Sequence, residues 1–235
     1  MTAHITAIIN GYGVPDDIRT DRSYHAYLVQ VLNWLWERYR TRAITIVPCG
    51  GKTDMRRPYR RTEAGEMVKW LTPRVRALGL ASRWRIAPIA TELTRLNFSR
   101  ENFGGLTALE NMIAVAKRYP KGPIVYFCEW TRLRKMRALA RRVFKKRTTV
   151  VGIEFDGSAP RYDLSGRRAL EREDLRYSIA ALEDPAWRRM LRAAAEEKIR
   201  VLRATPERIR ATEVDRVARR IRREYRTRYE RTRSS

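Results

Sequence analysis

The chain has 235 residues, of which 43% are hydrophobic and 33% charged, so it can bury a sizeable core beneath a very polar surface. Its net charge of +25 favours anionic partners such as nucleic acid, acidic lipid or phosphorylated ligands, although a GC-rich genome or growth at high temperature would also enrich arginine. Two cysteines exclude a disulfide framework, and no stretch approaches the roughly 20 apolar residues of a membrane span. These features predict a soluble, cytoplasmic protein.

Five short apolar runs stand out up to residue 154. They cover Ile5 to Tyr12, Ala43 to Pro48, Trp84 to Ala90, Pro123 to Cys128 and Thr148 to Glu154. The runs are continuous instead of alternating, which is typical of parallel strands that are covered on both faces. Asn10 interrupts the first run, so we interpret that run as a strand and not as part of a signal peptide.

Helical patterns lie between these runs and fill the end of the chain. Apolar residues at spacings of three and four predict helices at Tyr24 to Tyr39, Thr62 to Leu71, Ser99 to Tyr119 and Thr131 to Phe144. Strand alternating with helix predicts an α/β domain over residues 1–156, with a Rossmann-like, mostly parallel sheet of about five strands and helices on both faces. Residues 157–235 are predicted to form a basic, arginine-rich α-helical extension with helices at Arg168 to Leu182, Pro185 to Arg203 and Pro206 to about Arg231.

Two glycine motifs follow the first two strands, where a wound sheet binds its ligands. Gly11-Tyr12-Gly13 lacks the third glycine of a dinucleotide fingerprint. It forms either a tight turn that lets the backbone approach a ligand or a plain turn at the end of a strand. Gly50-Gly51-Lys52 lacks the spacing of a P-loop, but its backbone N–H groups and the Lys52 charge would suit an anion. The alternative for this second motif is a structural turn.

Acidic and polar residues recur where strands give way to helices. Thr62 is a fair helix N-cap and Glu63 complements the helix dipole, which explains Thr62 fully and Glu63 only in part. Glu92, with Glu101 and Asn102 close by, could gather carboxylates at one edge of the sheet. Such a cluster would bind a metal, act as an acid or base, or hold a cationic group. Alternatively, these acids pair with the abundant arginines.

Cys49 and Cys128 each end a predicted strand, so both thiols are expected at the same edge of the sheet. A nucleophilic or metal-binding role would need partners, and neither His4 nor His25 fits a ligand spacing. We therefore interpret both cysteines as small buried hydrophobic residues.

In their order along the chain, these motifs resemble the YdcF/SanA/ElyC family, a bacterial domain of unknown function. Members show Gly-Gly after the second strand, Ser-Glu-Ala with a following Met, a Glu, a Ser/Thr-x-Glu-Asn helix start, and a strand leading to Thr-x-x-x-His-x-x-Arg. The residues that match, within about residues 5 to 154, are Gly50, Gly51, Thr62, Glu63, Ala64, Met67, Glu92, Asn97, Ser99, Glu101, Asn102 and Arg134.

The chain departs from the family pattern at three places. Thr62 replaces the usual Ser and keeps a hydroxyl, and one extra residue separates Asn97 from Ser99. Thr131 stands where the family usually has His. If that His transfers a proton in the family, this chain either lacks the step or uses another group, for which Glu129 is the obvious substitute. The arginine-rich tail is not part of the family pattern.

The resemblance implies a Rossmann-like fold with a site above the strand ends. Some family members are associated with envelope and peptidoglycan biogenesis, and one branch is reported to bind S-adenosylmethionine. We therefore predict binding of a small anionic or nucleotide-like ligand, such as S-adenosylmethionine or a phosphorylated envelope precursor, at the carboxyl edge of the sheet. Whether the ligand is turned over stays open, because the family His is missing.

The candidate residues divide into two groups by role, and no metal ligands are predicted. Glu63, Glu92 and Glu129 are the candidate catalytic residues. The candidate ligand-binding residues are Gly11, Gly13, Gly50, Gly51, Lys52, Thr62, Asn97, Ser99, Glu101, Asn102 and Arg134.

The arginine-rich C-terminal helices support an alternative function, that of a module that binds nucleic acid or an acidic membrane. Acidic residues intersperse these arginines, which is typical instead of a solvated, ion-paired surface. A third alternative is that the tail packs on another subunit, and the oligomeric state is left open.

Overall fold

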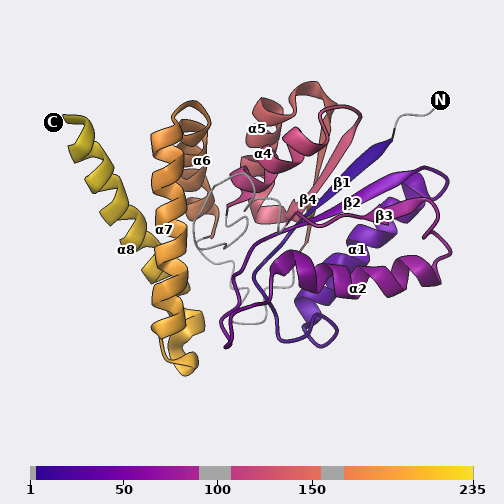
Figure 1. Ribbon diagram of the computed structural model, residues 1–235, viewed down its shortest axis with the longest axis horizontal. Helices are drawn as coiled ribbons and strands as arrows, with labels where there is room; N and C mark the ends of the chain where they lie inside the picture. The colour runs from indigo at the N-terminus through magenta and orange to yellow at the C-terminus, as the bar shows by residue number, and fades with distance from the viewer. Residues whose placement is uncertain (1–3, 90–106, 155–166, 235) are drawn as a thin grey trace.

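The computed structural model describes residues 4–89, 107–154 and 167–234 and has the predicted α/β fold (Figure 1). Its strands are β1 (Ile5–Asn10), β2 (Ile44–Cys49), β3 (Trp84–Ile86), β4 (Ile124–Glu129) and β5 (Thr148–Ile153). They form one sheet in the order β3-β2-β1-β4-β5, and every neighbouring pair is parallel. The expected sheet of about five mostly parallel strands is therefore confirmed.

The register of the three central strands brings their carboxyl ends to the same level. Asn10 at the end of β1 is opposite Cys49 at the end of β2, and Ile9 is opposite Phe127 of β4. The chain leaves β1 toward β2 on one side and later returns to β4 on the other side. A doubly wound sheet binds ligands at such a change of direction, which here lies between β1 and β4.

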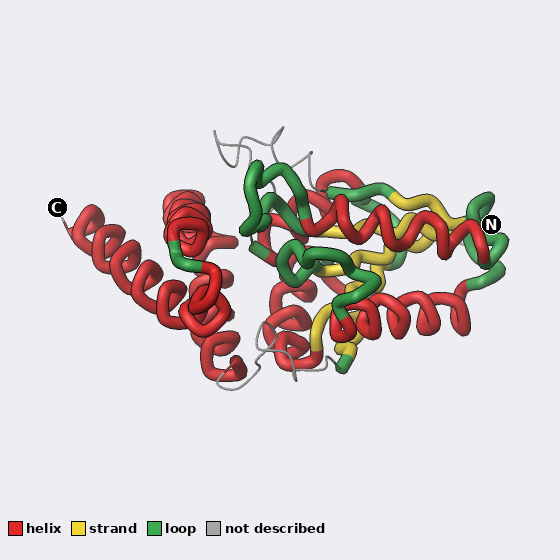
Figure 2. The backbone as a smooth tube through the Cα atoms, turned by 90° about the horizontal axis from the view of Figure 1, so that it is seen from below, coloured by secondary structure: helices red, strands yellow, loops and turns green. Residues whose placement is uncertain are grey.

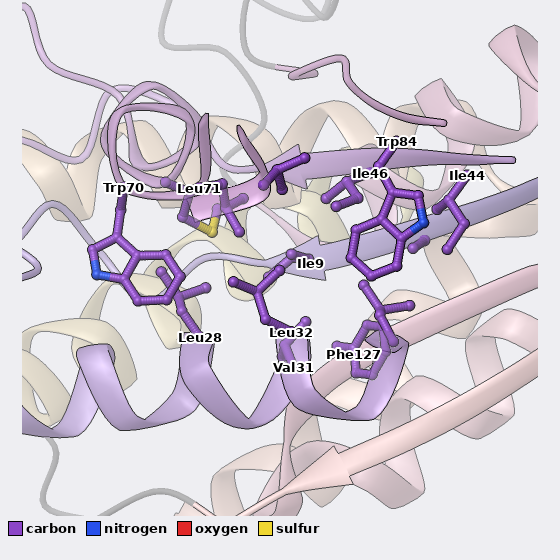
Figure 3. Close-up of a cluster of buried hydrophobic side chains, with 14 of the residues drawn as sticks. Ile9, Leu28, Val31, Leu32, Ile44, Ile46, Trp70, Leu71, Trp84 and Phe127 are labelled. Carbon is purple, nitrogen blue, oxygen red and sulfur yellow. The ribbon is translucent and has the colours of Figure 1, made fainter. Parts of the chain in front are cut away.

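Helices cover both faces of the sheet (Figure 1). Helices α1 (Arg22–Tyr39) and α2 (Glu63–Ala77) pack on one face, and α4 (Ala108–Arg118) and α5 (Leu133–Val143) pack on the other. Successive residues of β1 pack on opposite faces of the sheet: Ile9 packs with α1 and α2, and Ile8 packs with α4 and α5. Figure 3 shows the first of these cores, in which Trp70 and Leu71 of α2 meet Leu28 and Leu32 of α1 over the sheet. The central strands β1, β2 and β4 are buried along their whole length, so they read as continuous apolar runs.

The helix starts follow capping chemistry. The side chain of Asp21 accepts a hydrogen bond from the Tyr24 N–H at 3.0 Å, and Thr107 forms a capping box with Glu110 at the start of α4. The predicted start of α4 at Ser99 lies outside the described residues. The predicted strand from Trp84 ends early, since β3 stops at Ile86, and over the described residues up to 89 the pairing continues as a single bridge at Ile89.

Short 3₁₀ helices flank α5: η1 (Trp130–Arg132) and η2 (Lys145–Arg147). Beyond the sheet come α6 (Arg167–Glu183), α7 (Pro185–Ala204) and α8 (Glu207–Ser234), close to the predicted ranges. Asp184 caps α7 by accepting from the Ala186 N–H at 2.7 Å, with Pro185 in the first turn. In the part of the chain that the structure describes, no helix is both long and apolar enough to cross a bilayer.

Helix α7 lies across the carboxyl edge of the sheet (Figures 1 and 2). Near its start, the Arg192 guanidinium pairs with the Glu110 carboxylate of α4 at 3.0 Å. Near its end, Arg203 donates to the backbone carbonyls of Asp54 at 3.0 Å and Lys52 at 3.1 Å, in the loop that follows β2. The C-terminal helices therefore cover the edge at which we expected a ligand.

Candidate functional site

The carboxyl ends of β1 and β2 surround the side chain of Glu63, the first residue of α2. The Glu63 N–H donates to the Gly51 carbonyl at 3.1 Å, and the Ala64 N–H donates to the Gly50 carbonyl at 3.3 Å. A Cβ added to Gly11 would lie 2.2 Å from Glu63 Oε2, and one added to Gly50 would lie 2.3 Å from the same atom. The structure thus brings four of the predicted residues together and explains why two of them lack side chains.

The glycine loop after β2 uses its carbonyl groups to hold the start of α2. Gly51 accepts from Thr53 N–H at 3.0 Å as well as from Glu63, and the Thr53 hydroxyl donates to Glu63 Oε1 at 2.6 Å. We expected the N–H groups of this loop to face an anion. The charge that lies against Gly50 is instead the buried carboxylate of Glu63, which would repel an anion at this point. This end of the site is suited to hydroxyl, amino or cationic groups of a ligand.

Three other predicted residues have structural roles. Thr62 is the N-cap of α2 and accepts from the Gly65 N–H at 3.0 Å. The Lys52 carbonyl receives the hydrogen bond from Arg203 that anchors α7. Gly13 has a φ of +81°, a conformation that glycine adopts without strain, in the turn after β1.

Tyr12 bridges the carboxyl ends of β1 and β4. Its hydroxyl accepts a hydrogen bond from the Glu129 N–H, and the Arg132 guanidinium lies 4.6 Å from the centre of its ring. Burial raises the pKa of the Tyr12 hydroxyl well above its usual value, although the nearby Arg132 charge opposes this. Because this bulky side chain lies between the two strand ends, the candidate site is displaced toward β1 and β2.

Glu129 is buried at the end of β4, and both of its carboxylate oxygens accept from Thr131. The Thr131 N–H donates to Oε1 at 2.5 Å, and the Thr131 hydroxyl donates to Oε2. This pairing caps η1, so the Glu129 carboxylate, which we considered as a proton-transfer group, is engaged in a structural contact with Thr131. Proton transfer by Glu129 would require it to release this cap.

A buried ionic network connects the end of β4 to the C-terminal helices. Arg132 pairs with Glu171 of α6 at 3.2 Å, and Lys135 of α5 pairs with both Glu171 and Asp174, the latter at 3.3 Å. Arg222 of α8 donates to Asp174 at 3.1 Å. Burial alone would raise the pKa values of the two carboxyl groups, but the Lys135 charge, with Arg132 at Glu171 and Arg222 at Asp174, holds both below their ordinary values.

Lys198 of α7 is half-buried and makes no hydrogen bond or ion pair with the described residues. Burial, together with the Arg222 and Arg132 charges, lowers the pKa of its ammonium group to about 8, and the Asp174 and Glu63 charges oppose this shift. These interactions mean that Lys198 lies within electrostatic range of Glu63 at the sheet edge. The C-terminal extension therefore contributes a cation to the region that holds the predicted carboxylate.

Arg134 lies elsewhere, on the exposed side of α5. It lines an open groove of about 740 Å³ between η1, α5 and α6. The residues that line the groove are Trp130, Thr131, Leu133, Arg134, Lys135, Arg137, Ala138, Arg141, Glu171, Arg172 and Leu175. Neither Glu63 nor any of the predicted glycines is among them, so Arg134 belongs to a different feature from the one we expected.

Five of the candidate residues lie outside the described residues: Glu92, Asn97, Ser99, Glu101 and Asn102. Within the described ranges, no group of three or more His, Cys, Asp or Glu side chains could hold a metal ion.

Both cysteines are free and buried, and burial raises the pKa of each thiol, that of Cys128 to about 12. At Cys49 the neighbouring Glu63 charge adds to this effect. These thiols are packed as small hydrophobic residues, as the sequence indicated.

The sequence interpretation missed Lys198 and the acids of the network, although the sequence carried a signal for Glu171. Glu171 occupies the same helical stripe as Leu175, Ile179 and Leu182, which are partly buried against the core. A charged residue on an apolar stripe is expected to be buried and paired. The sequence gives no sign that the C-terminal extension packs on the sheet edge, which is what brings these residues to the site.

Comparison of the chain with family models, with curated proteins and with solved structures found no match.

Proposed function

We propose that the chain binds a small anionic or nucleotide-like ligand at the carboxyl edge of the sheet, between Glu63 and helix α7. The resemblance to the YdcF/SanA/ElyC family suggests the same place and includes S-adenosylmethionine and phosphorylated envelope precursors among the candidate ligands. Doubly wound sheets bind their ligands at this edge.

The observation that carries the proposal is the position of Lys198. A half-buried ammonium normally has a counter-charge, and Lys198 has no hydrogen bond or ion pair with the described residues. The phosphate or carboxylate of a ligand would supply this counter-charge. The nearby Arg132 and Arg222 charges lower the pKa of Lys198, and their positive potential would also attract an anion.

Glu63 would bind the opposite end of the ligand. Its carboxylate is fixed by the Thr53 hydroxyl at 2.6 Å and lies against the bare backbone of Gly11 and Gly50. A carboxylate near the strand ends of a doubly wound sheet commonly accepts hydrogen bonds from ribose hydroxyls. Nucleotides, S-adenosylmethionine and phosphosugars all combine hydroxyl groups with an anionic group, so each could meet both residues.

A thermal-shift screen across these three ligand classes tests the proposal. At 100 times its Kd, a ligand stabilises the folded state by about 2.7 kcal/mol. For a protein of this size that corresponds to a rise in Tm of about 5–10 °C. We expect a member of one class to give such a rise with the wild-type chain, and a much smaller one with Glu63→Gln or Lys198→Met.

Lys117→Met provides the matched control, because Lys117 is an exposed lysine on α4 and the same charge is removed far from the proposed contacts. This variant should respond as the wild type does. The proposal fails if no ligand of the three classes raises the wild-type Tm. It also fails if the two site variants respond as strongly as the control.

The alternative function of the C-terminal tail stays a prediction. Several arginines of α8 pair with acids on the same helix, among them Arg216 with Glu213 and Arg226 with Glu230. Deleting the tail would also break the Arg222–Asp174 pair, so exposed arginines should be substituted instead. Loss of polyanion binding in Arg219→Gln/Arg223→Gln would support the alternative. A cytoplasmic location, expected from the cysteine content, likewise stays a prediction.

A further inference from the structure

We propose that the groove between η1, α5 and α6 binds single-stranded nucleic acid. Four arginines line it, Arg134, Arg137 and Arg141 from α5 and Arg172 from α6, and all four side chains are exposed. None of them makes a hydrogen bond or ion pair with the residues that the structure describes. They differ in this from the paired arginines of α8, and their guanidinium groups are available to an external anion.

The groove carries little opposing negative charge. Among the described residues that line it, Glu171 is the one carboxylate, and Arg132 and Lys135 pair with that group. Leu133, Ala138 and Leu175 supply apolar surface within the same groove. Cationic side chains beside apolar surface suit a strand whose phosphates and bases point in different directions.

The spacing of the arginines favours an extended strand over a compact anion. Arg134, Arg137 and Arg141 follow one side of α5, and the rise of about 1.5 Å per residue spreads them over about 10 Å. Trp130, whose exposed fraction is 38%, lines the same groove and offers an aromatic surface for a base. Because the feature is concave, a narrow strand can enter it and meet the arginines of both α5 and α6.

Fluorescence anisotropy with a labelled 12-nucleotide oligo(dT) tests this inference, with salt varied from 50 to 200 mM. Four phosphate contacts by the groove arginines would contribute a salt slope of about −2.8, since each contact with a single strand contributes about −0.7. Arg137→Gln/Arg141→Gln should reduce the slope by about 1.4 and weaken binding by about 25-fold at 0.1 M salt. Both side chains are exposed, so the Tm of this variant should stay at the wild-type value.

Arg76→Gln/Arg85→Gln is the control, because it removes the same charge from exposed positions on α2 and β3. This control should keep the wild-type slope, and Trp130→Ala should weaken binding several-fold with an unchanged slope. The inference is overturned if the two double variants lose affinity equally, since binding would then follow net charge alone. The inference is also overturned if the wild-type protein does not bind oligo(dT) at 50 mM salt, or if the protein binds phosphatidylserine vesicles and not the oligonucleotide.

Discussion

Glu171→Gln should destabilise the protein by disrupting the ionic network between the end of β4 and the C-terminal helices. The Glu171 carboxylate is buried and pairs with Arg132 at 3.2 Å and with Lys135, whose side chain is 9% exposed. Removing one member of a buried ion pair costs about 3–5 kcal/mol, because the remaining charge stays buried without its partner. Glutamine keeps one acceptor oxygen, so we expect the lower end of this range.

Thermal unfolding followed by circular dichroism measures the effect. A loss of about 3 kcal/mol corresponds to a fall in Tm of about 6–12 °C at pH 7 for a chain of this length. The pKa of Glu171 is lower in the folded state than in the unfolded state. The ionised carboxylate therefore stabilises the fold at any pH above the ordinary glutamate pKa, near 4.3. This stabilisation is lost as the pH falls through the folded-state pKa. The difference in Tm between wild type and Glu171→Gln should therefore shrink at low pH.

Glu183→Gln is the matched control, since Glu183 is an exposed acid on the same helix. Its effect should stay within about 0.5 kcal/mol. If Glu171→Gln and Glu183→Gln unfold alike, the network does not stabilise the fold as argued. A difference between wild type and Glu171→Gln that persists undiminished in acid would show that charge is not its cause.

Three further predictions concern single residues. Gly50→Ala should cost about 1–3 kcal/mol more stability than Gly79→Ala, as measured by chemical denaturation. Both glycines have a positive φ, but of the two added Cβ atoms only the one at residue 50 would meet a carboxylate oxygen, at 2.3 Å. Equal losses in the two variants would contradict the packing described. Lys198→Met should raise the Tm at pH 7, because the folded pKa of Lys198 is lowered to about 8. Such a lysine destabilises the fold increasingly as the pH falls from its ordinary pKa near 10.4 to about 8, and fully below that, so the gain should vanish above about pH 10.4. A lower Tm at pH 7 would mean that the ammonium is stabilising. Cys49 and Cys128 should react with Ellman's reagent only after unfolding, because both thiols are buried and their pKa values are raised. Rapid reaction of the native protein would refute this prediction.

Local sequence patterns predicted most of the fold. Continuous apolar runs predicted the five strands of the described sheet. The physical reason is clearest for β1, β2 and β4, which are buried throughout and have no polar side. Cap residues such as Thr62 and Asp184 located helix starts closely. The predicted end of β3 was wrong by several residues, because the length of an edge strand depends on pairing with only one neighbour.

The site was predicted only in the part that the sheet alone creates. Gly11, Gly50 and Glu63 meet because parallel strands end at one edge, a consequence of topology that the sequence order already implies. Lys198 enters the same region because α7 packs across that edge through long-range contacts, and helix periodicity says nothing about such packing. Tyr12 was likewise not anticipated as a bridge, because its role depends on the register between β1 and β4.

The central claim, that the sheet edge and α7 form one anion-binding site, is tested most directly by titrating Lys198 by NMR, with and without the ligand found in the screen. We expect a pKa of about 8 in the free protein and a higher value once a bound anion stabilises the ammonium group. An ordinary lysine pKa near 10.4 that the ligand leaves unchanged would contradict the claim.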